Sequence, residues 1–126
     1  VEAKIMCQVY TAYLNDGIWS VPELMGTAYN PSSTNNTHPQ WAIWNDIEGL
    51  FISSDRSGGF GELDIWFISS ENQVYNLGPS INTQGNEVTP FYHSLEQKLY
   101  FSSDFHPGLG GFDIFQTPWE ENWGLV

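Results

Sequence analysis

Four aspartates that recur at matched positions have the clearest potential for chemistry in this chain. Asp55 and Asp64 flank one glycine-rich stretch, and Asp104 and Asp113 flank a second. Carboxylates beside backbone carbonyls are the hard oxygen ligands that Ca²⁺ takes in proteins. A short carboxylate can instead accept hydrogen bonds from nearby backbone N–H groups. Because the pattern occurs twice, we favour the structural role. We expect Asp55 and Asp104 to accept from the glycine loops, and Asp64 and Asp113 to hold the start of the next strand.

Known metal motifs do not fit the spacing. The calcium nonapeptide G-G-x-G-x-D needs aspartate at position 63, where the chain has Leu63, and EF-hand spacing is absent. The three histidines, His38, His93 and His106, lie at none of the spacings typical of zinc ligands. We therefore predict no metal site and no cofactor, with calcium binding by the Asp/Gly loops as the open alternative.

Catalytic signals are equally weak. No G-x-S-x-G sequence is present to place a nucleophilic serine on a sharp turn. The acids Glu62 and Asp64, or Glu120 and Glu121, could form a glycosidase pair. However, the chain has 15 acidic residues among 126, so neighbouring acids are expected by chance. We predict that this chain is not an enzyme.

Charge and composition exclude several partners. Fifteen acids face three bases, giving a formal net charge of −12, so no basic surface is available for nucleic acid or anionic membranes. No apolar run reaches the ~18 residues of a membrane span, and we expect no direct insertion by this segment. The single cysteine, Cys7, excludes an internal disulfide and is expected to be buried in the run Ile5-Met6-Cys7.

An internal repeat decides the predicted fold. Residues 50–66 (LFISSDRSGGFGELDIW) and 99–115 (LYFSSDFHPGLGGFDIF) align without a gap at an offset of 49, with eight of 17 positions identical. A second pair of related segments is 24–30 and 76–82, and a repeat near 50 residues fits a propeller blade. The motif positions are Ser54, Asp55, Gly59, Gly61 and Asp64 in the first copy and Ser103, Asp104, Gly108, Gly110 and Asp113 in the second.

Short β-branched and aromatic runs bounded by turn residues predict strands throughout, and no stretch has a helical period. We expect an all-β partial propeller with four-stranded antiparallel blades of about 50 residues. Residues 1–36 would hold the outer hairpin of an incomplete blade, with a turn at 15–17 between strands at 4–14 and 18–21. Residues 37–87 would form a complete blade (strands 40–44, 50–54, 63–69 and 73–77), and 88–126 a further blade (91–93, 98–103, 112–116 and 122–126).

Packing between blades should use the aromatic residues. Seven are expected to lie in this core: Trp41, Trp44, Phe51, Trp66, Tyr100, Phe101 and Phe115. Arg56 is expected to pair with a local acid. Phe60 and Leu109 occupy equivalent places inside the glycine loops, and loops at one end of a propeller often form its binding face. We therefore regard these two residues as candidate partner-binding positions.

The segment F-x-S-S-D-R-x-G-G-x-G-x-x-D-I-W (51–66) resembles the TolB-type, WD-like β-propeller repeat. The following N-L-G-x-x-I-N-T-x-G-N-E…P (76–90) is similar to propellers of envelope proteins that also carry an OmpA-like peptidoglycan-binding domain, some of them in type IX secretion and gliding machinery. The repeats and the lack of a catalytic constellation lead us to expect a non-enzymatic protein-binding scaffold. The resemblance implies that this scaffold lies in a Gram-negative periplasm, associated with the outer membrane. Peptidoglycan would be bound only through a domain not present in these residues.

Fewer than three blades cannot close a propeller, which needs roughly four to eight. We therefore expect either a longer polypeptide or further subunits to complete the ring, with other envelope proteins as partners. One alternative is a carbohydrate-binding propeller completed by oligomerisation, in which the aromatic loops hold sugars. Another is a propeller glycosidase, although 40–44 and 91–93 contain none of the acids that its central strands would need.

Overall fold

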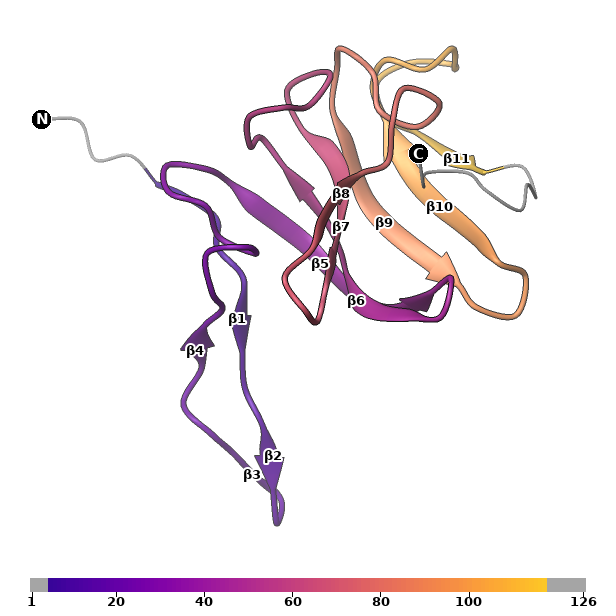
Figure 1. The fold of residues 1–126 in the computed structure, drawn as a ribbon. Coiled ribbons are helices and arrows are strands. Elements are labelled where there is room, and N and C mark those ends of the chain that lie inside the picture. Colours follow the sequence, from indigo (N-terminus) through magenta and orange to yellow (C-terminus); the bar gives the residue numbers. More distant parts are fainter. Residues whose placement is uncertain (1–4, 118–126) are drawn as a thin grey trace, which may run out of the picture.

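The computed structural model of the chain describes residues 5–117, which are all-β and contain no helix (Figure 1). Strands β1 (Tyr10–Thr11), β2 (Leu14–Asn15), β3 (Ile18–Trp19) and β4 (Glu23–Leu24) form an N-terminal ribbon. A four-stranded sheet comprises β5 (Asn36–Trp44), β6 (Ile47–Ser54), β7 (Asp64–Ser69) and β8 (Val74–Asn76). A three-stranded sheet comprises β9 (Glu87–His93), β10 (Lys98–Ser103) and β11 (Asp113–Gln116).

The four-stranded sheet is an antiparallel meander in the order β5-β6-β7-β8. Trp44 pairs with Ile47 across a two-residue turn, in which Asn45 and Asp46 have φ angles of 49° and 62°. Such turns favour Asn and Asp because both central residues need positive φ. The β9–β11 sheet repeats the meander with three described strands, and its predicted fourth strand (122–126) lies outside the described residues.

The four-stranded sheet is the middle layer of the molecule. One face packs on the β9–β11 sheet through aromatic rings, with Phe51 lying 4.9 Å from Phe67 and 5.7 Å from Tyr92 between ring centroids. Its other face packs Trp66 and Ile68 against Val9 of the N-terminal region. All six residues of β7 are buried as a result. Burial on both faces explains why this strand is a nearly continuous apolar run.

Not every predicted core aromatic is buried. Trp44, Phe51, Trp66 and Phe101 are buried, whereas Tyr100 and Phe115 are partly exposed. The prediction for Trp41 is wrong, because 52% of its surface is exposed. Trp41 neighbours the buried Trp44 in sequence on the first strand of the sheet, where no described element covers it. Cys7 is also exposed rather than buried, since its apolar neighbours precede the first strand and do not enter the core.

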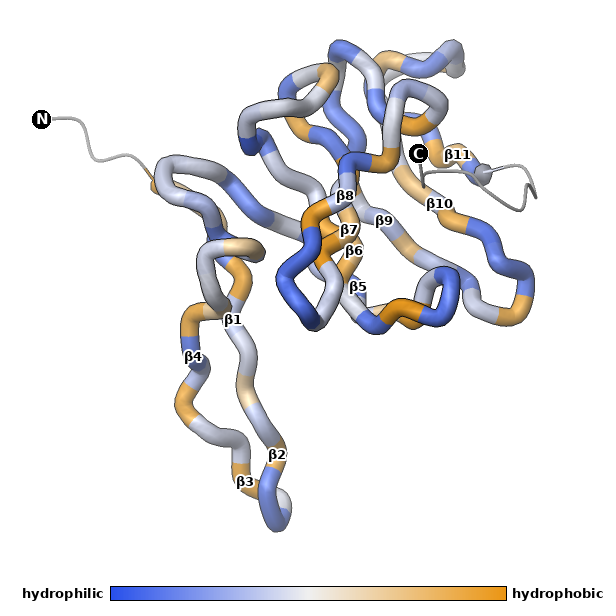
Figure 2. The backbone as a smooth tube through the Cα atoms, viewed as in Figure 1, coloured by the Kyte–Doolittle hydropathy of each residue, from blue (hydrophilic) through white to orange (hydrophobic). Residues whose placement is uncertain are grey.

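The N-terminal ribbon extends away from the two larger sheets (Figure 1). The predicted turn is present, with positive φ at Asp16 and Gly17. The predicted strand 4–14 is interrupted, and the predicted strand 18–21 is shorter, since only Ile18–Trp19 is a strand. Between the two short ladders, the N–H of Tyr13 donates to the Ser20 hydroxyl instead of a strand carbonyl. Apolar and polar residues alternate along this ribbon (Figure 2), and Trp19 is 66% exposed.

Candidate functional site

The glycine loops 55–63 and 104–112 lie at the same end of the two larger sheets, together with segment 77–86 (Figure 1). Asp64 organises the first loop, because its carboxylate accepts from the N–H groups of Phe60 (2.6 Å) and Gly61 (3.1 Å). Asp113 accepts from the N–H of Leu109 (2.7 Å) in the second. Each aspartate is the first residue of a strand, so it ties the loop to the strand that follows.

The recurring glycines are explained in part by this geometry. A Cβ atom on Gly59 would collide with the carboxylate of Asp64, and one on Gly108 would collide with that of Asp113. The aspartate folds back over the glycine, so the two residue types are required together. This pairing accounts for the fixed spacing of five residues between them in both copies.

Asp55 and Asp104 do not accept hydrogen bonds from the glycine loops, and that prediction is wrong. Asp55 accepts from the backbone N–H (2.6 Å) and the side-chain amide (2.9 Å) of Asn35. Asp104 accepts from the same two groups of Asn86, at 2.7 and 3.0 Å. Each asparagine directly precedes the first strand of its sheet. Each contact therefore joins the end of the second strand of a sheet to the start of its first strand. The hydrogen bonds from Asn86 also lower the pKa of Asp104.

Among residues 5–117 Arg56 has no acidic partner, contrary to expectation. It is 8% exposed and its guanidinium donates to the carbonyl oxygens of Ala28 (2.8 Å) and Tyr29 (3.0 Å) and to Oδ1 of Asn36 (2.9 Å). It also lies 5.5 Å from the centre of the Trp66 ring. Burial lowers the pKa of Arg56 to about 10, which leaves the guanidinium charged at neutral pH. Arg56 thus joins the N-terminal region to the four-stranded sheet.

Glu87 occupies the equivalent junction between the two larger sheets. Its carboxylate is fully buried and accepts from the Ser103 hydroxyl (2.7 Å) and from the N–H of Thr83 (2.8 Å). Nε2 of His106 lies 2.7 Å from the carbonyl oxygen of Ile81. A buried carboxylate with several donors is a stable arrangement and is not by itself a catalytic signal.

Asn30 and Asn82 were not predicted to have a role. The Asn30 amide bonds both the N–H (2.8 Å) and the C=O (2.9 Å) of Val9, and Asn82 does the same for Ile65, at 2.7 and 2.9 Å. Asn82 thus clamps β7 from the segment that follows β8, and Asn30 clamps the residue before β1 from the segment that follows β4. The sequence signal was available, because both residues end the second pair of repeated segments, 24–30 and 76–82.

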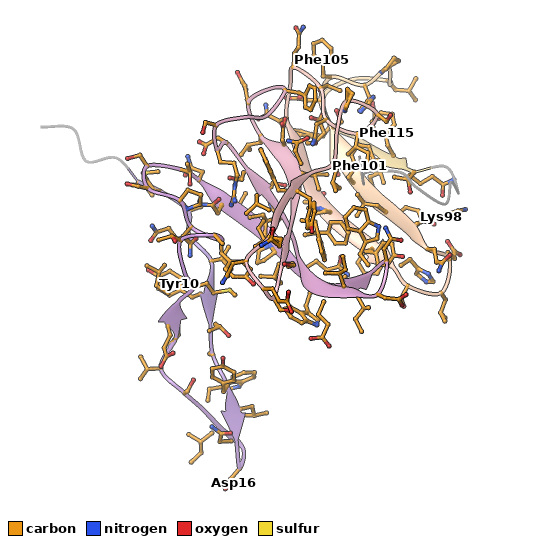
Figure 3. The ribbon with its side chains drawn as sticks, in the orientation of Figure 1. Tyr10, Asp16, Lys98, Phe101, Phe105 and Phe115 are labelled. Atoms are coloured by element: carbon orange, nitrogen blue, oxygen red, sulfur yellow. The ribbon has the colours of Figure 1, made fainter. Side chains whose placement is uncertain are left out.

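Bulky apolar side chains are exposed on both glycine loops. Phe60 is 48% exposed and Leu109 fully exposed, at the same repeat position. Phe105 and Phe112 are each 56% exposed, and Figure 3 places Phe105 at the extremity of this end of the molecule. The name loop-end patch is used below for Phe60, Phe105, Leu109 and Phe112.

Acidic groups accompany the loop-end patch. The side-chain amide of Asn86 lies 3.0 Å from oxygens of both Glu62 and Asp104, so the two carboxylates meet on one donor between adjacent loops. Within residues 5–117 no three His, Cys, Asp or Glu side chains are grouped as metal ligands. At the opposite end, a hollow of about 330 Å³ is lined by residues in and beside the β5–β6 and β7–β8 turns, with the acids Asp46, Glu48 and Glu71 among them.

Residues 5–117 contain no helix with the length and hydropathy of a membrane-spanning segment. Comparison of the sequence and structure with protein-family models, curated proteins and solved structures found no significant match to any of them. The fold itself defines the class: residues 5–117 form an all-β protein of small antiparallel sheets.

Proposed function

We propose that this chain is part of a non-enzymatic, propeller-like scaffold that binds a partner protein through the loop-end patch. The observation that carries the proposal is the matched presentation of Phe60 and Leu109. Both sit at one repeat position, and the N–H of each donates to the aspartate that begins the next strand. Exposed apolar side chains on anchored loops form binding surfaces at little cost in conformational entropy.

The propeller-like architecture is supported by the stacking of successive units. The β5–β8 meander packs face to face on the β9–β11 meander, and the N-terminal region covers its other face. The two larger sheets also share an internal hydrogen bond, from Asn35 to Asp55 in one and from Asn86 to Asp104 in the other. The envelope setting, with outer-membrane association and other envelope proteins as partners, rests on the sequence resemblance alone.

Site-specific photocrosslinking tests the proposal. A benzoyl-phenylalanine placed at Phe60 or Leu109 should give a discrete protein adduct in cells that make the protein. The matched control is Val74, which is 42% exposed on β8 in the same sheet as Phe60's loop. Adducts at the loop positions but not at Val74 are expected. Equal adducts at all three positions, or none at the loops, would refute the assignment of this surface.

Two other outcomes would replace the proposal. Binding to glycans that disappears with Phe60→Ala would favour the carbohydrate-binding alternative. Hydrolysis of a glycan or peptide that is lost with Glu62→Gln or Asp64→Asn would show an enzyme. The Asp64 variant needs a folding control by circular dichroism, because this carboxylate organises the glycine loop.

A further inference from the structure

Gly110 is a glycine whose identity is unexplained by residues 5–117. At the equivalent Gly61, an added Cβ would lie 2.6 Å from backbone atoms of both Gln84 and Gly85 and would collide with the carbonyl of Thr83. At Gly110 no atom of the described residues, its two chain neighbours aside, lies within 4 Å of such a Cβ. Neither glycine has a positive φ, so neither is needed for its backbone conformation. Glycine is required at position 61 because a neighbouring backbone segment leaves no room for a side chain. Position 110 is also glycine, but none of the described residues lies there as that neighbour.

The neighbour of Gly61 is residues 83–86, called here the lead-in segment because it precedes the first strand of the next sheet. The N–H of Glu62 donates to the carbonyl of Gly85 (3.0 Å), and the N–H of Glu87 donates to that of Leu63 (2.7 Å). The earlier lead-in, residues 30–35, docks in the same way: the N–H of Asn36, which follows it, donates to the backbone carbonyl of Cys7 (2.8 Å). Docking of a lead-in onto the preceding unit is thus a repeated feature.

The face beside Gly110 is also left open by the residues that the structure describes. On the middle sheet, Phe51 and Ile65 are fully buried against β9–β11. Their repeat equivalents on the outer face of β9–β11 are Tyr100, which is partly exposed, and Ile114, which is 78% exposed. Phe91 on the neighbouring strand, paired with Tyr100, is 52% exposed. The positions that are covered in one unit are therefore open in the next.

From these matched positions we infer that the outer face of β9–β11 docks a further unit of the same repeat, whose lead-in segment crosses Gly110 as residues 83–86 cross Gly61. The inference deepens the proposed scaffold and rests on its propeller-like stacking. It identifies the partner by chemistry: a β-meander with an apolar face and an extended lead-in that offers backbone N–H and C=O groups to residues 111 and 112.

A folded second copy of the described region does not fit as this partner. Both of its lead-in segments, 30–35 and 83–86, are already docked within their own chain. The face of its middle sheet that would meet β9–β11 is covered by Val9 and Tyr29. The docked unit must therefore come from residues other than 5–117.

Crosslinking at Ile114 tests this inference. Benzoyl-phenylalanine at Ile114, in cells that make the protein, should give a crosslinked peptide from outside residues 5–117 that carries the Ser-Ser-Asp and glycine-loop pattern. The control position is Leu95, which is 91% exposed in the turn between β9 and β10. A crosslink to residues 5–117 of a second copy, to a peptide without the repeat pattern, or to nothing would overturn the inference.

A valine pair isolates the lead-in contact. Gly110→Val should reduce the Ile114 crosslink at least tenfold while leaving the melting temperature of the 126-residue chain unchanged, because the site is open. Gly61→Val should lower that melting temperature, because the lead-in is already in place. An unreduced crosslink with Gly110→Val would show that no backbone crosses this glycine. Loss of crosslinks at Phe60 and Leu109 with retention at Ile114 would refute only the loop-end partner.

Discussion

The first junction in this molecule lies between the N-terminal region and the four-stranded sheet, and the second lies between the two larger sheets. Each has a buried serine at the same position, but the charged side chain bonded to it is Arg56 at the first and Glu87 at the second. At the first, the Arg56 guanidinium donates to carbonyls of the N-terminal region and to Asn36. At the second, Glu87 replaces Asn36, and its carboxylate accepts from Ser103 and Thr83. The carbonyl of Tyr29 is bonded by Arg56, and that of Ile81, its equivalent, is approached by His106.

What remains constant between the junctions is the serine. The Ser54 hydroxyl donates to Asn36 and accepts from the N–H of Arg56, and the Ser103 hydroxyl donates to Glu87 and accepts from the N–H of Phe105. Both serines are about 1% exposed. The comparison teaches that the fold requires satisfied buried polar atoms at this place, and that either a cation or an anion can provide the remaining partners.

Removing the Arg56 guanidinium from the first junction should lower the free energy of unfolding more than any other change at either junction. Arg56→Ala removes the guanidinium bonds to the carbonyls of Ala28 and Tyr29, while Asn36 keeps its bond from Ser54. Each buried group left without a partner costs about 1–3 kcal/mol. We expect the free energy of unfolding to fall by roughly 3 kcal/mol, measured by urea denaturation. The control is Lys98→Ala, which removes another basic residue, at the start of β10. It should change the free energy of unfolding by less than about 0.5 kcal/mol. Equal effects of the two substitutions would contradict the role assigned to Arg56.

Neutralising the anion should have a smaller effect. Glu87→Gln keeps the shape of the side chain but turns one acceptor oxygen into a donor, which then faces the donors of Thr83 or Ser103. A loss of about 2 kcal/mol is expected in the same measurement. Glu71→Gln, on an exposed turn, provides the matched control. An unchanged midpoint for Glu87→Gln would mean that the buried carboxylate is not needed at this junction.

The histidine at the second junction should contribute less. Its ring packs 5.7 Å from Phe101 and 5.2 Å from Phe115, between ring centroids. His106→Phe keeps an aromatic ring but loses the contact to the Ile81 carbonyl, so a loss of about 1 kcal/mol is expected. His106→Ala removes both contributions and should cost more. If the two variants have the same stability, ring packing makes no contribution here.

The smallest expected effect is a pH dependence of the contact between Asn86 and Asp104, within the β9–β11 sheet. Hydrogen bonds from Asn86 hold the pKa of Asp104 below its ordinary value of 3.8. The ionised form is therefore favoured in the folded state, and its contribution to stability is complete above pH 3.8 and lost as the pH falls through the lowered pKa. The difference in melting temperature between the wild type and Asp104→Asn should shrink over that interval. A constant difference would show that the carboxylate charge is irrelevant.

Local patterns were sufficient to predict most of the described strands. Short β-branched and aromatic runs bounded by turn residues locate β6, β7 and β10, with ends that shift by a few residues. The same reasoning misplaced Trp41 and Cys7, because an apolar residue is buried only where another element covers it. It also gave Asp55 the wrong partner, since Asn35 lies 20 residues away in sequence and is adjacent only after β5 pairs with β6.

The sequence by itself determined the local elements, because short-range rules act on neighbouring residues: turn residues need positive φ, β-branched and aromatic runs favour strands, and an aspartate folds back on a glycine five positions earlier. Only the tertiary structure decided which groups meet across the junctions. Arg56 bonds carbonyls 27 and 28 residues away, and Gly61 lies against a segment that begins 22 positions later. Such contacts depend on how sheets stack, which no local spacing specifies. The open space at Gly110 became informative only when compared with the filled space at Gly61.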